Sequence, residues 1–190
     1  QLAGYYPAPN QTTHRGSARI QTNRFGMRAP DFQVQKPPGV TRVLMLGDSV
    51  LYGGSYIDQP QLFARQVARH LTARGLQVEV LNMAANGWGP EHKAGFVEAH
   101  GSFDADLAVI VLPYKDLFRP LSPLAGLPYF AVDQPPRFAL EEVFLHLSWR
   151  AHRSLQGKRP RAERERFGPR GVAAYLALAE RLRGEGMQVI

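Results

Sequence analysis

Three predominantly apolar runs, each followed by a turn-rich loop, constrain the fold of this chain more than any other feature. The runs span residues 42–46, 78–81 and 107–112, with Arg42 and Glu79 as their charged residues. Strands that are mostly apolar on both faces are typical of parallel sheets covered by helices. Helical spacing of apolar residues occurs between and after the runs. The alternation predicts an α/β fold with an open, mostly parallel sheet and helices on each side.

The sequence divides into segments of different composition. Residues 1–41 are rich in Pro, Gly, Gln, Thr and Asn and are expected to form an extended lead-in. Residues 42–190 are expected to form one α/β domain, with an irregular Pro-rich insertion at 113–138 and a basic linker at 156–170. Apolar spacing predicts helices over residues 60–74, 90–100, 140–155 and 171–183, and the opening of a fourth strand over 187–190.

The positive charge of the chain is concentrated in one stretch. The formal net charge is +7, and residues 150–170 hold eight Lys and Arg against two Glu. Aromatic residues do not interleave these cations before Phe167, so the pattern disfavours nucleic-acid binding. It favours either a solvated linker or contact with an anionic surface, such as a polysaccharide or lipid headgroups. The absence of cysteine excludes disulfides and thiolate metal sites, and neither a metal nor a cofactor is expected.

Glycines and polar residues follow each of the first three predicted strands. In open α/β sheets, function gathers in the loops at the carboxyl ends of the strands, and these loops begin at residues 47, 82 and 113. Acyl transfer needs a nucleophile and donors for the developing oxyanion. Ser49 is the candidate nucleophile, with its own N–H and that of Gly87 as candidate oxyanion donors. Lys115 is a candidate side-chain donor from the third loop.

The same loops resemble the first three sequence blocks of the SGNH (GDSL-type) hydrolases. The matching elements are Gly47-Asp48-Ser49, Asn82 with Gly87 five residues later, and a loop ending in Asp116. The similarity covers roughly residues 22–120, and its upstream part resembles the lead-in of SGNH-like proteins found with bacterial envelope and exopolysaccharide systems. The resemblance implies a flavodoxin-like α/β/α sandwich with Ser49 as nucleophile and Gly87 as oxyanion donor. It assigns supporting positions to Asp48, Asn82 and Asp116, with Asn82 tying its loop by side-chain hydrogen bonds.

The sequence departs from the family pattern at two points. The third block of the family reads Gly-x-Asn-Asp, whereas this chain has Pro-Tyr-Lys-Asp over residues 113–116. Lys115 therefore either donates to the oxyanion in place of the Asn or turns to solvent or to a neighbouring carboxylate. The Asp-x-x-His block that holds the general base does not occur, and each of the six histidines, His92 near Gly87 included, is expected to be a surface or half-buried residue. We therefore expect a fragment truncated at its C-terminus.

Two functional hypotheses follow from the resemblance. The first is a serine-dependent ester hydrolase or O-acyltransferase acting on an acylated small molecule or carbohydrate, with O-acetyl groups on a carbohydrate as the favoured substrate. The alternative is a catalytically degenerate protein of the same fold that binds a glycan or an assembly partner. A periplasmic or envelope-associated bacterial location is expected, a cytoplasmic one stays open, and membrane attachment is expected only through an anchor preceding Gln1.

Overall fold

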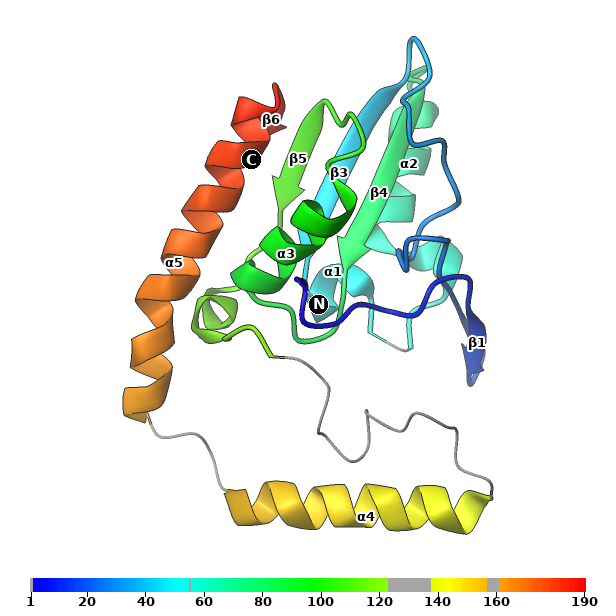
Figure 1. Cartoon of the computed structure of the whole chain (residues 1–190). Coiled ribbons are helices and arrows are strands. Elements are labelled where there is room, and N and C mark those ends of the chain that lie inside the picture. Colours follow the sequence, from blue (N-terminus) through cyan, green and yellow to red (C-terminus); the bar gives the residue numbers. More distant parts are fainter. Residues whose placement is uncertain (1, 55, 123–137, 157–160) are drawn as a thin grey trace.

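A four-stranded parallel sheet forms the centre of the computed structural model, which describes residues 2–54, 56–122, 138–156 and 161–190 (Figure 1). Its strands are β3 (Thr41–Gly47), β4 (Val78–Ala84), β5 (Leu107–Ile110) and β6 (Gln188–Val189). They lie in the order β4-β3-β5-β6, and all three neighbouring pairs are parallel. Counted along the chain this order is 2-1-3-4, as in the first four strands of a flavodoxin-like sheet. The predicted α/β fold is confirmed.

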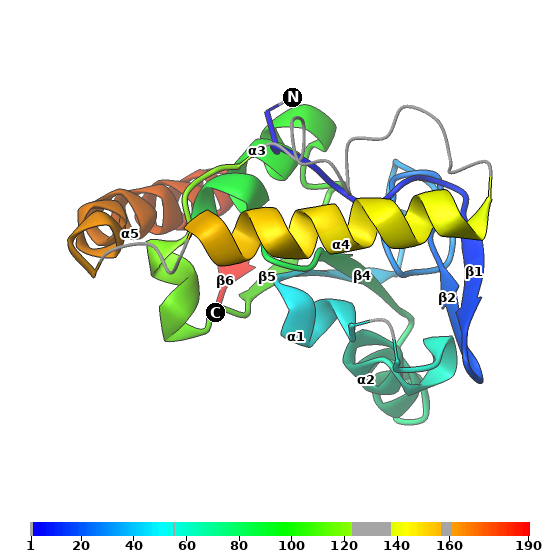
Figure 2. The ribbon, with the colours of Figure 1, turned by 90° about the horizontal axis from the view of Figure 1, so that it is seen from below.

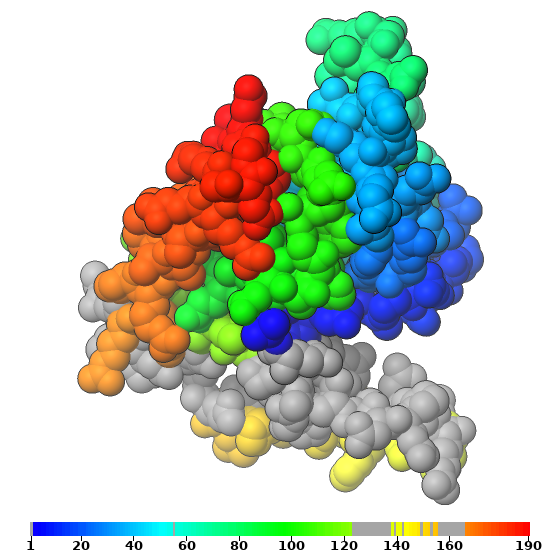
Figure 3. Space-filling view, turned by 45° about the horizontal axis from the view of Figure 1, so that its top comes forward, coloured from blue at the N-terminus to red at the C-terminus, as the bar shows by residue number. Residues whose placement is uncertain are grey.

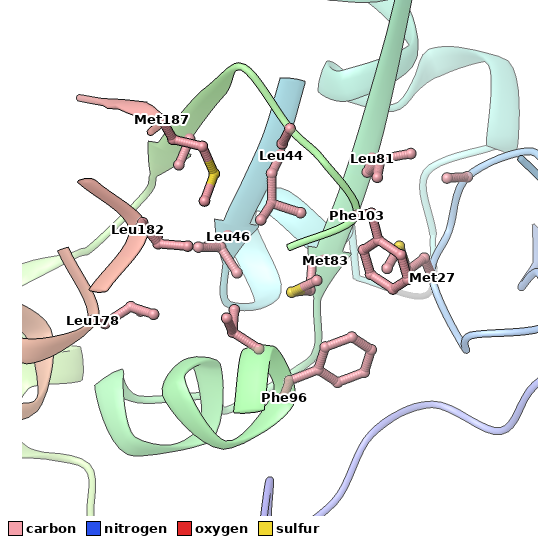
Figure 4. Close-up of a cluster of buried hydrophobic side chains, with 14 of the residues drawn as sticks. Met27, Leu44, Leu46, Leu81, Met83, Phe96, Phe103, Leu178, Leu182 and Met187 are labelled. Carbon is pink, nitrogen blue, oxygen red and sulfur yellow. The ribbon is translucent and has the colours of Figure 1, made fainter. Parts of the chain in front are cut away.

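Helices cover both faces of the sheet because successive side chains of a strand point to opposite sides. Val43 and Met45 of β3 lie in a buried cluster with residues of the helices on one face, and Leu44 and Leu46 lie in a second cluster on the other (Figure 4). The first face carries α1 (Ser49–Tyr52) and α2 (Phe63–Thr72), and the second carries α3 (Pro90–His100) and α5 (Arg161–Gly184). The expected three-layer α/β/α sandwich is therefore present.

The lead-in is folded into the domain and is not simply extended. It contains an antiparallel hairpin of β1 (Thr12–Arg15) and β2 (Ala18–Gln21). After the hairpin, Met27 joins the core of the sheet domain near Phe103 (Figure 4). Phe32 joins the same core and makes an edge contact with the Phe103 ring. In the space-filling view the N-terminal segment, in blue, lies against the body of the domain (Figure 3). Isolated apolar residues provide this packing, and they leave no periodic signal in the sequence.

Two fully buried arginines connect the lead-in to the sheet domain through side-chain hydrogen bonds. The Arg28 guanidinium donates to the carbonyl oxygens of Tyr52, Gly54 and Ile57 at 3.0, 2.9 and 2.8 Å. The Arg42 guanidinium, on β3, donates to carbonyl oxygens of the lead-in at Gln33 and Val34 and pairs with Glu79 of β4. Buried charges of this kind are stable only when several hydrogen bonds satisfy them.

The structure also shifts the boundaries of several predicted elements. The helix expected over 60–74 begins at Phe63, and Pro60 lies in a preceding 3₁₀ turn, η1 (Gln59–Gln61). The helix α4 (Ala139–Gln156) agrees closely with the expected 140–155. The expected basic linker is instead helical from Arg161 onward as the start of α5, with Pro169 inside the helix. Of the expected insertion, residues 114–118 form a 3₁₀ helix, η2 (Tyr114–Phe118), and residues 123–137 lie outside the described part of the chain.

Candidate active site

The topology brings the first and third predicted loops to one edge of the sheet. β3 pairs with β4 on one side and with β5 on the other, so the strand order reverses at β3. In such sheets the crevice outside the carboxyl ends of the strands at this switch point is the usual binding site. Ser49 follows the carboxyl end of β3, and η2 follows that of β5. Figure 1 shows α1 and η2 at this end of the sheet.

Ser49 is the first residue of α1, and its side chain is half-buried. Its hydroxyl donates to Asp48 Oδ2 over 3.3 Å between the oxygens. Asp48 is fully buried and caps the helix, because its Oδ1 accepts the Val50 N–H at 2.9 Å. One carboxylate therefore fixes both the start of α1 and the direction of the Ser49 hydroxyl.

Asn82 supports the same helix from the neighbouring strand. It is buried near the end of β4, and its Nδ2 donates to the Leu51 carbonyl oxygen of α1 at 3.1 Å. The supporting role implied by the family resemblance fits this geometry, although the bond reaches α1 and not the loop that follows Asn82. Replacing the amide would leave a buried carbonyl without its donor, which is costly.

Gly87 lies in the loop between β4 and α3 with a φ of +81°, a conformation that glycine adopts without strain. A Cβ at this position would lie 2.8 Å from the Tyr5 hydroxyl oxygen and 3.4 Å from Arg119 Nη1. Among the described residues, the N–H groups of Gly87 and Ser49 have no hydrogen-bond acceptor. Ser49 and Gly87 are both half-exposed at the carboxyl edge of the sheet, and each has a main-chain N–H without an acceptor among the described residues.

Lys115 and Asp116 point to different environments. Lys115 is exposed on η2, whereas the Asp116 carboxylate is fully buried. Asp116 pairs with Arg119 Nε at 3.0 Å and lies 3.9 Å from Lys93 Nζ of α3. The Lys115 side chain therefore faces solvent in this structure. Lys93 is a site residue that sequence reasoning missed, because no local pattern links it to residue 116.

Burial dominates the electrostatics of this cluster. It raises the pKa of Asp116 to about 6; Arg119 and Lys93 oppose the shift, and the neighbouring Asp48 carboxylate adds to it. Burial likewise lowers the pKa of Lys93 to about 8, although both carboxylates counteract it. Among the described residues, no group of three or more His, Asp or Glu side chains is arranged to hold a metal ion. The cluster places charged groups of α3 and η2 beside the residue that precedes α1, and Lys93 Nζ makes no hydrogen bond among the described residues.

His92 is fully buried, and the expectation that it is a surface or half-buried residue is wrong. Its Nδ1 lies 3.2 Å from the Gly89 nitrogen and its Nε2 lies 3.3 Å from the Ser122 nitrogen. A neutral imidazole accepts at one nitrogen only, so only one of these contacts is a full hydrogen bond. Burial lowers the pKa of His92 to about 4. A base that weak, with both nitrogens facing main-chain amides, does not activate Ser49.

No family model and no curated protein matches this chain. Solved structures that align with it include AlinE4, an SGNH-hydrolase family esterase (16% identity, TM-score 0.38, 82% of this chain and 77% of that chain). TesA aligns at 17% identity and a TM-score of 0.38, over 78% of this chain and 77% of that chain. A catalytic mutant of Axe2, an acetylxylan esterase from Geobacillus stearothermophilus, aligns at 16% identity and a TM-score of 0.37, over 79% and 75%. Likenesses at these values carry no argument about activity.

Proposed function

We propose that this chain belongs to a serine-dependent ester hydrolase or O-acyltransferase of SGNH type. The observation that carries the proposal is the half-exposed Ser49 hydroxyl at the switch point of the sheet, oriented by the buried Asp48 carboxylate. The unused N–H groups of Ser49 and Gly87 supply candidate donors at the same edge. A nucleophile and main-chain donors are the two parts that acyl transfer requires of the protein besides a base.

In this mechanism Ser49 Oγ attacks the carbonyl carbon of an ester. The hydroxyl proton passes to a base, the carbonyl oxygen becomes an oxyanion held by the N–H groups of Ser49 and Gly87, and the alcohol leaves with a proton. Water or a second hydroxyl then attacks the acyl-enzyme and releases Ser49. No Asp-x-x-His block, which holds the base in the family that the loops resemble, occurs in the sequence, and the mechanism assigns no residue as the base.

We propose O-acetyl groups on a carbohydrate as the substrate and the bacterial envelope as the location. The resemblance of the lead-in to SGNH-like proteins of exopolysaccharide systems supports both. An exposed aromatic, Tyr114 on η2, stands near Asp116 in sequence and offers a face on which a sugar ring can stack.

Acyl transfer to Ser49 tests the proposal without requiring full turnover. The chain is incubated with p-nitrophenyl acetate, and acetylation is located by peptide mass spectrometry in the wild type, Ser49→Ala and Ser17→Ala. Ser17 is an exposed serine in the β1–β2 turn and serves as the matched control. Because no described residue acts as the base, we expect slow acetylation at residue 49 in the wild type and Ser17→Ala, and none there in Ser49→Ala. Unchanged p-nitrophenol release by Ser49→Ala would exclude Ser49 as the nucleophile.

The alternative is a glycan-binding protein that keeps the fold without the chemistry. One observation favours it: the Tyr5 hydroxyl and the Arg119 guanidinium already occupy the space next to Gly87. Binding of acetylated and deacetylated oligosaccharides, measured by calorimetry on the wild type and Ser49→Ala, separates the two functions. Equal affinity of both proteins for both glycans, together with no acetylation of Ser49, would favour the binding protein.

A further inference from the structure

The helix α4 carries an apolar stripe that no part of the described chain covers. Leu140, Val143, Phe144, Leu147 and Leu155 follow the i, i+3, i+4, i+7 spacing of one helix face, and between 52% and 88% of each is exposed. Exposed stripes of this size on a folded domain usually mark an interaction surface. Figures 1 and 2 place α4 on the side of the domain where the strands of the sheet end, apart from the core.

Positive charge adjoins the stripe. Arg150 follows Leu147 by three residues, which places it on the flank of the apolar face, and it is exposed. Within α4 itself Glu141 and Glu142 balance Arg150 and Arg153, and the excess positive charge lies in residues 150–170, which hold most of the chain's net charge of +7. Of the cations on α5, Arg166 is exposed and Arg170 pairs with Glu91. A basic stretch that directly follows an amphipathic helix is a pattern of contact with anionic lipid.

Two other occupants match the stripe but not the charge. A groove of about 540 Å³ between η2 and α5 is apolar; its lining residues are Tyr114, Leu117, Phe118, Gly168, Pro169, Val172, Ala173 and Leu176. None of these residues is acidic, so the groove offers nothing to the cations beside the stripe. A second copy of the chain also carries +7, so its net charge opposes association, and its own α4 offers only Glu141 and Glu142 to the cations.

We infer that α4 docks on a membrane surface rich in anionic phospholipid, with its apolar stripe in the headgroup region. Among the described residues no helix is long and apolar enough to cross a bilayer, so α4 lies on the surface and does not span it. This contact differs from an anchor preceding Gln1, and it adds an apolar docking face to the anionic-surface contact that the basic stretch at 150–170 suggests.

Vesicle flotation tests the inference directly. The 190-residue chain is mixed with vesicles of phosphatidylglycerol and phosphatidylcholine, or of phosphatidylcholine alone, at low and high salt. We expect binding to the anionic vesicles that falls about tenfold without phosphatidylglycerol or at 0.5 M salt. Leu147→Glu is expected to weaken binding about tenfold as well, whereas Leu76→Glu, the same change at a residue 50% exposed outside α4, is expected to leave binding unchanged.

Insertion of the stripe itself is measured with a fluorescent label. Because the sequence has no cysteine, Leu147→Cys and Leu76→Cys each provide one labelling site for an NBD fluorophore. We expect a blue shift and higher intensity at residue 147 on anionic vesicles, and no change at residue 76. Absence of flotation, flotation that Leu147→Glu does not weaken, or a concentration-dependent dimer that Leu147→Glu dissociates would each overturn the inference.

Discussion

The Nζ of Lys93 lies 3.9 Å from Oδ2 of Asp116, and both side chains are fully buried. Because Arg119 also pairs with Asp116, Lys93→Met leaves the Asp116 carboxylate with one partner, whereas Asp116→Asn leaves the buried Lys93 ammonium without its ion-pair partner, which costs about 3–5 kcal/mol. We therefore predict that Asp116→Asn lowers the free energy of unfolding by about that amount in urea titrations and that Lys93→Met lowers it less. Arg181→Met, which breaks the surface pair of Arg181 with Glu185, is expected to cost less than about 1 kcal/mol.

The double variant Lys93→Met with Asp116→Asn completes the cycle. Because it removes both buried charges, we expect it to be more stable than Asp116→Asn alone. A double variant whose loss equals the sum of the two single losses would show that Lys93 and Asp116 do not interact.

The buried imidazole of His92 makes stability depend on pH in a defined direction. Its pKa in the folded state is lowered from 6.5 to about 4, so between these values the unfolded chain binds the proton and the folded chain does not. The contribution of His92 is therefore present above about pH 6.5 and is lost as the pH falls toward 4.

This dependence is measured as a difference between two proteins. His92→Gln lacks the titrating group, so its stability deficit relative to the wild type is expected to shrink by up to about 3 kcal/mol between pH 7 and pH 4. Both proteins contain Asp116, whose raised pKa makes the fold gain stability as the pH falls below about 6. Taking the difference between the two stabilities cancels this contribution. A deficit that stays constant across this range would show that His92 titrates normally.

The sheet and the position of Ser49 could be predicted because both depend on local signals. Apolar runs mark buried strands, and a turn after such a run places its residues at the carboxyl edge. Lys93 could not be found in this way, because its partner Asp116 is 23 positions away and only the tertiary fold, in which α3 and η2 both contact α5, brings them together. The start of α5 was missed for a different reason: its Arg and Glu residues have high helix propensity, but their charge made the segment resemble a linker.

Gly87 is predicted to tolerate no side chain, for two separable reasons. Its φ of +81° strains any alanine by about 1–2 kcal/mol, and the new Cβ would lie 2.8 Å from the Tyr5 hydroxyl oxygen. Gly75 has a φ of +85°, and a Cβ added there would meet no atom within 4 Å, so Gly75→Ala reports the backbone strain alone. We expect Gly87→Ala to be the more destabilising variant and to slow acetylation of Ser49, which Gly75→Ala leaves unchanged.

We expect the Tyr5 hydroxyl to cause the larger loss of stability in Gly87→Ala than in Gly75→Ala. In a Tyr5→Phe background the oxygen is absent, and the stability gap between Gly87→Ala and Gly75→Ala is expected to narrow. Thermal unfolding of the four variants measures the gap. The same gap with and without the hydroxyl would mean that crowding by Tyr5 does not limit this position.

Arg28 is predicted to hold the segment after Ser49 in place as well as to stabilise the fold. Its planar guanidinium donates to the carbonyl oxygens of Tyr52, Gly54 and Ile57, and a lysine ammonium cannot reproduce that fork. Arg28→Lys is therefore expected to lower the unfolding free energy by about 2–4 kcal/mol. Hydrogen exchange at residues 52–54 should quicken by more than this global loss explains, whereas Arg69→Lys, at an exposed position on α2, should change neither quantity. Uniform exchange changes across the domain would instead assign Arg28 a purely global role.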